Sequence, residues 1–209
     1  MEHYWSIEGN IGAGKTTLLD RLIELRPDIK PLFEPVDTWN AIEVETGDGL
    51  LEAFYEDQKK FAFLFQTTCL ITRSRLLKEW MKSGDAKRPT IQERCLLSDR
   101  ETFVLHLLES GALTDAEYRV LSLMYDHLSE ECPRPIFFYI DTPPVLCLDR
   151  VRARMRVGEE HVTIDYLTSL DEKLRRFALR NSDRVIVLDG RHSTEELARQ
   201  VLRCIDPSD

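Results

Sequence analysis

A glycine-rich segment near the start of the chain constrains its fold more than any other feature. Residues 9–16 read GNIGAGKT, which matches the pattern GxxxxGK[ST]. A short, mostly apolar run precedes the segment, and a helical pattern of leucines follows it. In this strand–loop–helix order, backbone N–H groups, a helix N-terminus and a lysine can surround phosphate groups. We therefore expect a phosphate-bearing ligand at this loop, with Lys15 on its terminal phosphates and the Thr16 hydroxyl on Mg²⁺.

The rest of the chain alternates predicted strands with predicted helices, which indicates an α/β domain on a parallel sheet. Five strands are expected, over residues 3–8, 30–34, 89–93, 136–140 and 185–188. Helices are expected over residues 15–25, 50–55, 57–81, 96–109, 114–131, 143–156 and 164–181, with a last helix capped by Ser193. Residues 40–48 are expected to be irregular. The predicted fold is a single domain over residues 1–209, a P-loop NTPase-type five-stranded parallel sheet flanked by helices.

Charge and cysteine content narrow the class of protein. The net charge is −9, which argues against a protein that binds duplex DNA or RNA through a broad basic face. The five cysteines form no CxxC pair, so we expect reduced thiols and no zinc site. No apolar run approaches transmembrane length, and the first predicted strand leaves no room for a targeting peptide. We expect a cytoplasmic protein, or one in the host cytoplasm if the source is a virus.

Charged residues follow two further predicted strands. Ligands of parallel sheets lie beyond the carboxyl ends of the strands, so these residues should face the same crevice as the glycine-rich loop. Glu34 there could accept a proton as a general base, although by itself it would read as a solvated loop carboxylate. Glu93 could hold Mg²⁺ through water, and Arg94 could stabilise charge on a transferred phosphoryl group. The alternative for this second pair is a surface ion pair.

Polar residues also recur on the predicted helices. Gln66 and Arg73 are seven residues apart and share a helix face, and Tyr55 joins that face if the helix is continuous. Buried polar groups need partners, and a ligand can provide them. On the next helix Asp99 and Phe103 are four residues apart, and Asp99 could pair with Arg73 either within a site or as a structural ion pair. The aromatic residues of 61–65 are expected to belong to the core or a subunit interface.

Four arginines crowd the end of the helix predicted over 143–156. They occupy alternate positions and are followed by an acidic pair: Arg150, Arg152, Arg154, Arg156, Glu159 and Glu160. This pattern is typical of a mobile lid over phosphates, which we place at about residues 150–162. The alternative is a solvated, charged helix end.

Taken in order, these motifs resemble the deoxynucleoside kinase family, which includes deoxycytidine and deoxyguanosine kinases. The matching segments cover nearly the whole chain, at residues 7–17, 34–39, 54–76, 93–103 and 150–167. The resemblance implies transfer of the ATP γ-phosphoryl group, with Mg²⁺, to the 5′-hydroxyl of a 2′-deoxynucleoside. It also implies a homodimer built on helices and a place in nucleotide salvage and DNA precursor synthesis.

The resemblance assigns roles residue by residue. The residues implied to be catalytic are Lys15, Glu34, Arg94 and Arg154. Those implied to bind the nucleoside are Trp39, Tyr55, Gln66, Arg73, Asp99, Phe103 and Glu159. Those implied to bind ATP are Gly9, Asn10, Ile11, Gly12, Ala13, Gly14, Lys15, Thr16, Thr17, Arg150, Arg154 and Arg156. The metal would be held by Thr16 and Glu93.

At two places this sequence differs from the usual motifs of the family that it resembles. Cys95 stands where the family motif usually has serine, and Val157-Gly158 stand where acidic or polar lid residues are common. The Arg73–Asp99 pair resembles members that prefer deoxycytidine and purine deoxynucleosides. An ionised Asp99 can only accept hydrogen bonds, so it suits an exocyclic amino group and opposes the thymine carbonyl. We expect these nucleosides to be favoured over thymidine.

Two other functions compete with this prediction. A nucleoside monophosphate kinase of the thymidylate type shares the P-loop but needs a further basic site for the acceptor phosphate. A non-catalytic P-loop scaffold would be expected to lose Lys15, Glu34 or Arg94, and all three are present.

Overall fold

The computed structural model describes residues 4–156 and 158–206. At its centre lies a sheet of five parallel strands in the order β2-β3-β1-β4-β5. The strands are β1 (Tyr4–Gly9), β2 (Lys30–Leu32), β3 (Thr90–Glu93), β4 (Ile136–Asp141) and β5 (Val185–Asp189). The expected five-stranded α/β fold is thereby confirmed. Because β3 lies between β1 and β2, the segments that follow these three strands meet at one edge of the sheet.

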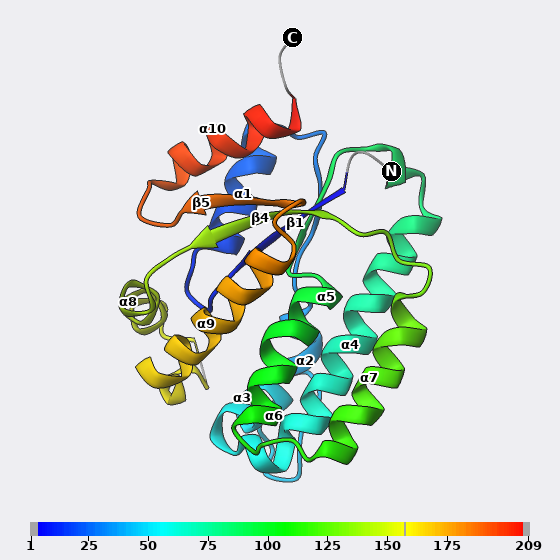
Figure 1. Cartoon of the computed structure of the whole chain (residues 1–209), viewed down its shortest axis with the longest axis vertical. Helices are drawn as coiled ribbons and strands as arrows, with labels where there is room; N and C mark the ends of the chain where they lie inside the picture. Colours follow the sequence, from blue (N-terminus) through cyan, green and yellow to red (C-terminus); the bar gives the residue numbers. More distant parts are fainter. Residues whose placement is uncertain (1–3, 157, 207–209) are drawn as a thin grey trace.

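Helices cover both faces of the sheet (Figure 1). On one face α1 (Lys15–Leu25) packs beside α10 (Thr194–Ile205), and on the other α9 (Ile164–Arg180) crosses the strands. The central strands are buried on both faces, as parallel sheets require, and Ile7 and Phe138 are fully buried in them. Ligands of such sheets lie beyond the carboxyl ends of the strands.

A second helical layer extends beyond that edge (Figure 1). It contains α3 (Leu50–Glu56), the long α4 (Gln58–Lys82) and α7 (Asp115–Ser129), with α4 and α7 packed side by side. Its apolar core is separate from that of the sheet and includes Trp39, Phe54, Phe65 and Leu107. A space between two independently packed layers is where ligand sites commonly form.

Three local features differ from the sequence-based expectation. Residues Val36–Asn40 form a short helix, α2, which buries Trp39 and whose weak helix formers gave no periodic signal. The helix expected over 96–109 is divided into α5 (Leu96–Asp99), a π-helical turn (Arg100–Val104) and α6 (Leu105–Glu109). A π-helical turn of this kind is frequent beside functional sites.

The lid helix also ends earlier than expected. Helix α8 spans Pro144–Arg154 and stops where Met155 adopts a left-handed conformation, with φ at 47°. A turn of 3₁₀ helix at Glu159–His161 follows it, and a similar turn at Gly84–Lys87 follows α4. Arg156 therefore lies beyond the helix that carries Arg150 and Arg154.

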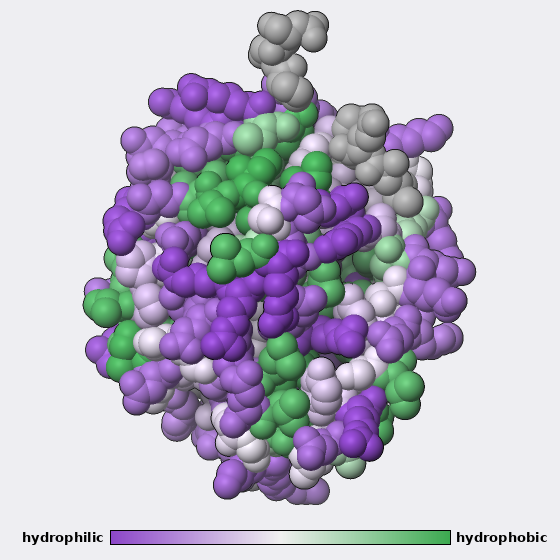
Figure 2. Space-filling view, viewed as in Figure 1, coloured by the Kyte–Doolittle hydropathy of each residue, from purple (hydrophilic) through white to green (hydrophobic). Residues whose placement is uncertain are grey.

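The surface is mostly hydrophilic, with apolar side chains gathered over β5 beneath α10 in the view of Figure 2. Val187 of this edge strand is exposed. Within residues 4–156 and 158–206, no helix is long and apolar enough to cross a membrane. All five cysteines are free.

Candidate active site

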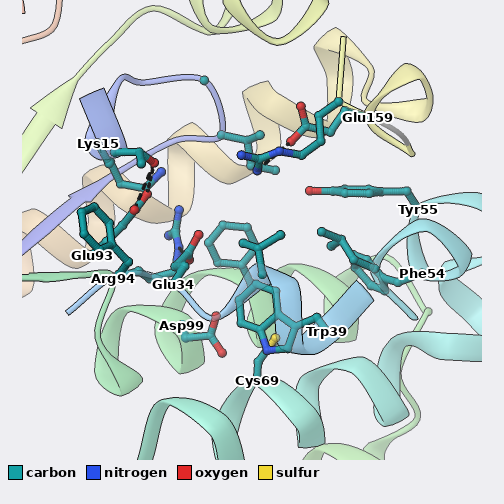
Figure 3. Close-up of a pocket in the computed structure, with 18 of the residues that line it drawn as sticks. Lys15, Glu34, Trp39, Phe54, Tyr55, Cys69, Glu93, Arg94, Asp99 and Glu159 are labelled. Carbon is teal, nitrogen blue, oxygen red and sulfur yellow. Dashed lines mark hydrogen bonds and ion pairs between the residues drawn. The ribbon is translucent and has the colours of Figure 1, made fainter. Parts of the chain in front are cut away.

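A cavity of about 470 Å³ opens at the carboxyl edge of the sheet, between the glycine-rich loop and the second helical layer (Figure 3). Its volume lies in the range of small-molecule sites. Charged residues line the end near the loop, and aromatic residues line the end near α3 and α4. The cavity can therefore hold a ligand with a charged and an apolar part.

The phosphate loop, residues 9–16, forms the floor of the charged end. The Lys15 ammonium donates to the backbone oxygen of Asn10 at 2.9 Å and lies 3.4 Å from that of Gly9. The Asn10 side chain ties the loop to α9 by donating to the Leu167 carbonyl at 2.8 Å. At Gly12 a Cβ atom would lie 2.4 Å from the backbone oxygen of Cys147, so only glycine lets the loop pack against α8.

Burial, and then the neighbouring Arg94, lower the pKa of Lys15 to about 8, while Glu93 opposes the change. A dianionic or trianionic phosphate group beside it would favour the charged form of this lysine. The loop thus has a cation whose protonation is coupled to ligand binding.

Thr16 and Glu93 supply oxygen atoms side by side. The Thr16 hydroxyl lies 2.9 and 3.0 Å from the two carboxylate oxygens of Glu93. Burial, and then the proximity of Glu34, raise the pKa of Glu93. Hard oxygen donors beside a phosphate loop fit Mg²⁺, which takes few protein ligands and completes its shell with phosphate and water. Among the described residues no group of three His, Cys, Asp or Glu side chains could hold a metal by itself.

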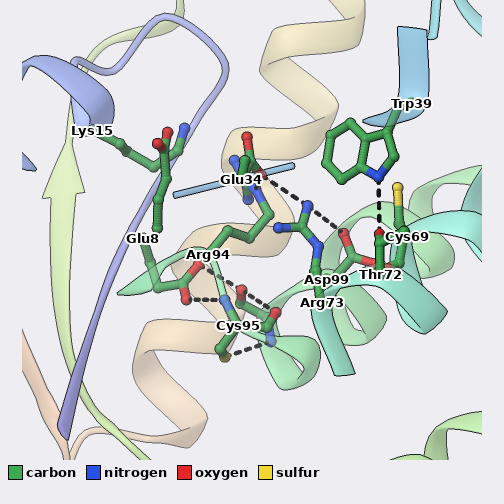
Figure 4. Close-up of polar contacts among 12 residues, drawn as sticks. Glu8, Lys15, Glu34, Trp39, Cys69, Thr72, Arg73, Arg94, Cys95 and Asp99 are labelled. Atoms are coloured by element: carbon green, nitrogen blue, oxygen red, sulfur yellow. Dashed lines mark hydrogen bonds and ion pairs between the residues drawn. The ribbon is translucent and has the colours of Figure 1, made fainter. Parts of the chain in front are cut away.

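Glu34 lies at the middle of the cavity, two residues past the end of β2 (Figure 4). One of its oxygens, Oε1, accepts hydrogen bonds from Arg94 Nε at 3.0 Å and from Arg73 Nη2 at 2.8 Å. Burial would raise the pKa of Glu34, but Arg73, Arg94 and Lys15 outweigh it and lower the pKa to about 2. Within residues 4–156 and 158–206 no hydrogen bond or ion pair involves the other oxygen, Oε2, so Glu34 is an ionised carboxylate with one oxygen available to a ligand.

Arg73 connects Glu34 with Asp99. Its Nη2 atom lies 3.7 Å from Asp99 Oδ1, so the expected Arg73–Asp99 pair forms but is longer than the contact with Glu34. Arg73 is only 3% exposed, and its Nε and Nη1 atoms have no hydrogen-bond partner in the part of the chain that the structure describes. Burial raises the pKa of Asp99 while Arg73 opposes the change.

Gln66, at the same end of the cavity, also has a buried acceptor, Oε1, without a hydrogen-bond partner among the described residues. Unpaired buried polar atoms are rare and costly, so those of Gln66 and Arg73 are best satisfied by a ligand that presents both donors and acceptors.

Aromatic rings form the walls around these polar groups. Phe54 and Phe65 are stacked with centroids 4.5 Å apart, and Trp39 meets Phe65 edge to face at 5.4 Å. Phe103 lies under the Arg94 guanidinium, whose carbon is 4.3 Å from the ring centroid. A flat heterocycle fits such a slot, with its polar edge toward Gln66 and Asp99.

Three residues of the segment predicted to form a lid, Arg154, Arg156 and Glu159, line the cavity on the side of α8. Arg154 makes a bidentate ion pair with Glu159, and the Nη1 atom of Arg156 lies 3.6 Å from the same carboxylate. Glu159 is only 5% exposed and lines the cavity together with Tyr55. Burial, and then the charge of Glu159, raise the pKa of Tyr55 well above its usual value. Arg150 instead donates to the backbone oxygens of Ala13 and Gly190, at 3.1 and 3.0 Å.

Most of the expected site residues meet at this cavity. Those that line it are Ile11, Gly12, Gly14, Lys15, Thr16, Thr17, Glu34, Trp39, Tyr55, Gln66, Arg73, Glu93, Arg94, Asp99, Phe103, Arg154, Arg156 and Glu159. Those behind the lining are Gly9, Asn10, Ala13 and Arg150. Tyr55 reaches the cavity from a separate helix, because the helical conformation is interrupted at Asp57, between α3 and α4.

Several lining residues were not anticipated from the sequence. They are Phe33, Val36, Leu51, Phe54, Phe65, Cys69 and Tyr166. Phe65 belongs to the aromatic run that was expected in the core or an interface, and it serves both the core and the cavity wall. Because Phe65 is adjacent to Gln66, the sequence could have indicated that it lines the cavity. Tyr166 lies seven residues after the predicted site residue Glu159. Two positions depart from the usual family motif. Cys95 caps α5 through its sulfur, which lies 3.4 Å from the Ser98 nitrogen. Val157 lies outside the described residues.

Comparison with known proteins gives the family. Residues 5–205 match the profile of the deoxynucleoside kinases. A kinase protein of Invertebrate iridescent virus 3 is 29% identical over 205 residues, covering 98% of this chain and 97% of the relative. Deoxycytidine kinase 2 of Gallus gallus is 31% identical over 188 residues, covering 80% of this chain and 71% of the relative.

A solved structure shares the fold. The deoxyadenosine kinase of M. mycoides with bound dCTP superposes with a TM-score of 0.82 at 20% identity, covering 98% of this chain and all of that one. With the profile match and the curated relatives, this likeness establishes that the chain is a deoxynucleoside kinase and belongs to the deoxynucleoside kinase family.

Proposed function

We propose that this kinase transfers the γ-phosphoryl group of ATP to the 5′-hydroxyl of 2′-deoxynucleosides, preferring deoxycytidine and purine deoxynucleosides over thymidine. The observation that carries the proposal is the position of Glu34. It lies between the phosphate loop and the aromatic slot and is held by two buried arginines. A nucleoside with its base in the slot would direct its 5′-hydroxyl toward this carboxylate and the loop.

In this mechanism Glu34 accepts the proton of the 5′-hydroxyl. Its pKa of about 2 makes it a weak base, but it also keeps the carboxylate ionised at every physiological pH. Phosphoryl transfer passes through a loose transition state that needs positioning and charge stabilisation more than a strong base. Lys15, Arg94 and Arg154 would supply that stabilisation around the transferred group.

Thr16 and Glu93 would hold Mg²⁺ next to the phosphate loop. When bound, the ion would neutralise charge on the donor phosphates. Burial and the nearby Glu34 raise the pKa of Glu93, and a bound cation would favour its ionised form.

The base preference rests on the polar end of the slot. Gln66 Oε1 and Asp99 can accept from an exocyclic amino group, and the unpaired Arg73 nitrogens can donate to a ring nitrogen or carbonyl. Thymine presents a carbonyl where cytosine presents its amino group, which would leave an acceptor facing an acceptor. Such a mismatch costs about 1–3 kcal/mol, enough to set a preference.

Tyr55 and Glu159 would bind the 3′-hydroxyl, since both side chains face the cavity opposite Glu34 (Figure 3). The lid residue Glu159 then touches the acceptor while its partner Arg154 faces the donor. At the 5′ end, the Glu34 carboxylate would repel a phosphate group, which favours an acceptor with a free 5′-hydroxyl over a nucleoside monophosphate.

We also propose a homodimer through the outer face of α4 and α7. Four large apolar residues on these two adjacent helices are exposed, namely Leu64, Ile71, Val120 and Leu123. Burial of such a patch against a second copy would remove it from water. A role in nucleotide salvage and DNA precursor synthesis in the cytoplasm completes the proposal.

The deciding experiment is a coupled phosphorylation assay with ATP and Mg²⁺ on the four deoxynucleosides and on thymidine monophosphate. Turnover of deoxycytidine or a purine deoxynucleoside, with little on thymidine, is expected. Strong turnover of thymidine would reject the proposed preference for deoxycytidine and purine deoxynucleosides. Turnover confined to thymidine monophosphate would indicate a thymidylate-type kinase. Binding of ATP without any turnover would indicate a non-catalytic scaffold. Glu34→Gln should abolish turnover with little loss of nucleoside binding.

A double variant tests the base preference itself. Replacing Arg73 and Asp99 together by apolar residues should shift the ranking toward thymidine, since the acceptor that opposes the thymine carbonyl is removed together with the arginine that pairs with it. An unchanged ranking would refute the assigned roles of this pair.

A further inference from the structure

One fully buried carboxylate lies beside this site and has no role in the mechanism above. Glu8, in the central strand β1, directly precedes the phosphate loop and is 0% exposed. Its Oε1 atom accepts from the Ser6 hydroxyl at 2.6 Å and from the backbone N–H of Cys95 at 3.0 Å. Its Oε2 atom accepts from the Ser98 hydroxyl. None of the ion pairs found among the described residues includes Glu8 (Figure 4).

A buried carboxylate is costly unless its acceptors are satisfied, so the three donors fix the position of this side chain. Two of the donors come from one short segment, residues 95–98, which is 87 to 90 residues away in sequence. Glu8 thus fastens β1 to the turn between β3 and α5.

That turn has an unusual backbone. Arg94 adopts φ of 58°, a left-handed conformation that non-glycine residues rarely take and that surrounding contacts must maintain. The backbone N–H of Arg94 donates to the Ile7 carbonyl at 3.1 Å. Together with the two bonds to Glu8 and the bond from the Arg94 guanidinium to the Gly9 carbonyl, this gives strand β1 four hydrogen bonds to residues 94–98.

The anchored turn carries two groups of the proposed site. On one side the Arg94 guanidinium reaches the Gly9 carbonyl at 3.0 Å and Glu34 at 3.0 Å. On the other side Asp99 is the last residue of α5, whose first turn begins at Cys95. The position of both side chains therefore depends on the same attachment.

We propose that Glu8 is a positioning residue for catalysis: by anchoring residues 95–98 to β1, it sets Arg94 against Glu34 and Asp99 against the nucleobase. The inference rests on the proposed function for the roles of these partners. It adds that a buried carboxylate one residue before the loop helps to hold the donor loop and the acceptor pocket in register, beside the bonds that Arg94 makes to the Ile7 and Gly9 carbonyls.

The test uses two serine variants that each remove one hydrogen bond from the same carboxylate. Ser98→Ala removes a bond on the side of the turn, and Ser6→Ala removes one on the side of the strand. We expect Ser98→Ala to lower kcat and raise KM for deoxycytidine, with Ser6→Ala close to the parent. Glu8→Met, which removes every acceptor at similar volume, should lower kcat/KM for the nucleoside by about 10²-fold, the usual effect of displacing a catalytic group by about 1 Å.

The dissociation constant of ATP separates positioning from general damage. The phosphate loop is attached to α9 through Asn10 and is closed internally by Lys15, so ATP binding should be unchanged in all three variants. A variant that only lost stability would reduce the folded fraction, which lowers the apparent kcat but leaves the nucleoside KM unchanged. Equal nucleoside kinetics for Ser98→Ala and Ser6→Ala would overturn the proposal.

Hydrogen exchange provides a readout that does not depend on turnover. Amides of residues 94–99 should exchange faster in Ser98→Ala and Glu8→Met than in Ser6→Ala, with the strands unchanged. Equal protection in Ser98→Ala and Ser6→Ala refutes the anchoring role, whatever the enzyme phosphorylates and even if Glu8→Met does not fold. A parent that is inert on every deoxynucleoside refutes the proposed function, and the exchange result then decides the anchoring by itself.

Discussion

Removal of the Arg73 charge should change the pH at which this kinase loses activity. Arg73 donates to Glu34 at 2.8 Å and is the foremost of the cations that lower the pKa of Glu34 from 4.5 to about 2. That difference corresponds to roughly 3 kcal/mol in favour of the carboxylate. Arg73→Met keeps the length of the side chain and removes both the charge and the hydrogen bond.

The size of the effect follows from the contact that is lost. A hydrogen bond to a charged group contributes about 1.5–3 kcal/mol, which equals about one to two pH units in the pKa of its acceptor. Burial, which raises the pKa, would then be opposed only by Arg94 and Lys15. We expect the pKa of Glu34 to rise to about 3–4 or above in Arg73→Met.

The direction of the change in the pH profile follows from the proposal that Glu34 acts in its ionised form. In the parent enzyme its ionisation should not limit kcat/KM anywhere between about pH 4 and pH 8, since the pKa is about 2. In Arg73→Met, kcat/KM for deoxycytidine should start to fall at a pH that is one to two units higher. The depressed pKa also stabilises the folded parent above pH 4.5, and this contribution is lost as the pH falls from 4.5 through about 2.

The assay is a pH profile of kcat/KM for deoxycytidine, paired with titration of the Glu34 carboxyl carbon by NMR. Asp99→Asn is the matched control, because it removes the other carboxylate beside Arg73 and leaves the Arg73–Glu34 contact. It should alter base preference without raising the pKa of Glu34. If kcat/KM fell at the same acidic pH in Arg73→Met and in the parent, the electrostatic role given to Arg73 would be refuted.

Four further results are expected. Affinity for ATP should weaken as pH rises through about 8, because Lys15 loses its proton there in the free enzyme, and calorimetric titrations at pH 7 and pH 9 that agree would contradict this. Glu93→Gln should raise the Mg²⁺ concentration needed for half-maximal rate, measured by Mg²⁺ titration of turnover. Gly158→Ala should weaken nucleoside binding, since φ is 83° and a Cβ would lie 2.9 Å from Glu52 Cα; unchanged nucleoside KM would show that this lid contact is dispensable. Leu123→Glu, at a residue 70% exposed, should give a monomer in analytical ultracentrifugation, and a dimer of parent affinity would place the interface elsewhere.

Much of this site follows from the sequence because its key elements are local. The phosphate loop is a run of consecutive residues, and its chemistry depends on spacing within one strand–loop–helix unit. Glu34, Glu93 and Arg94 could be proposed because parallel strands present their carboxyl ends at one edge. The resemblance to a family then supplied the residues on helices, such as Gln66, that no periodic pattern assigns to a ligand.

Tertiary structure alone decided which of these groups contact one another. The sequence suggested that Arg73 would pair with Asp99, whereas the fold gives its shorter contact to Glu34, 39 residues away, because β3 brings Arg94 and Glu34 together beneath α4. Likewise Glu8 meets Cys95 only because β1 and β3 are neighbours in the sheet. Periodicity reports which face of an element is buried, and it carries no information about the partner on that face. The strand order supplies the partner, so it fixes the charges, pKa values and positions on which the chemistry depends.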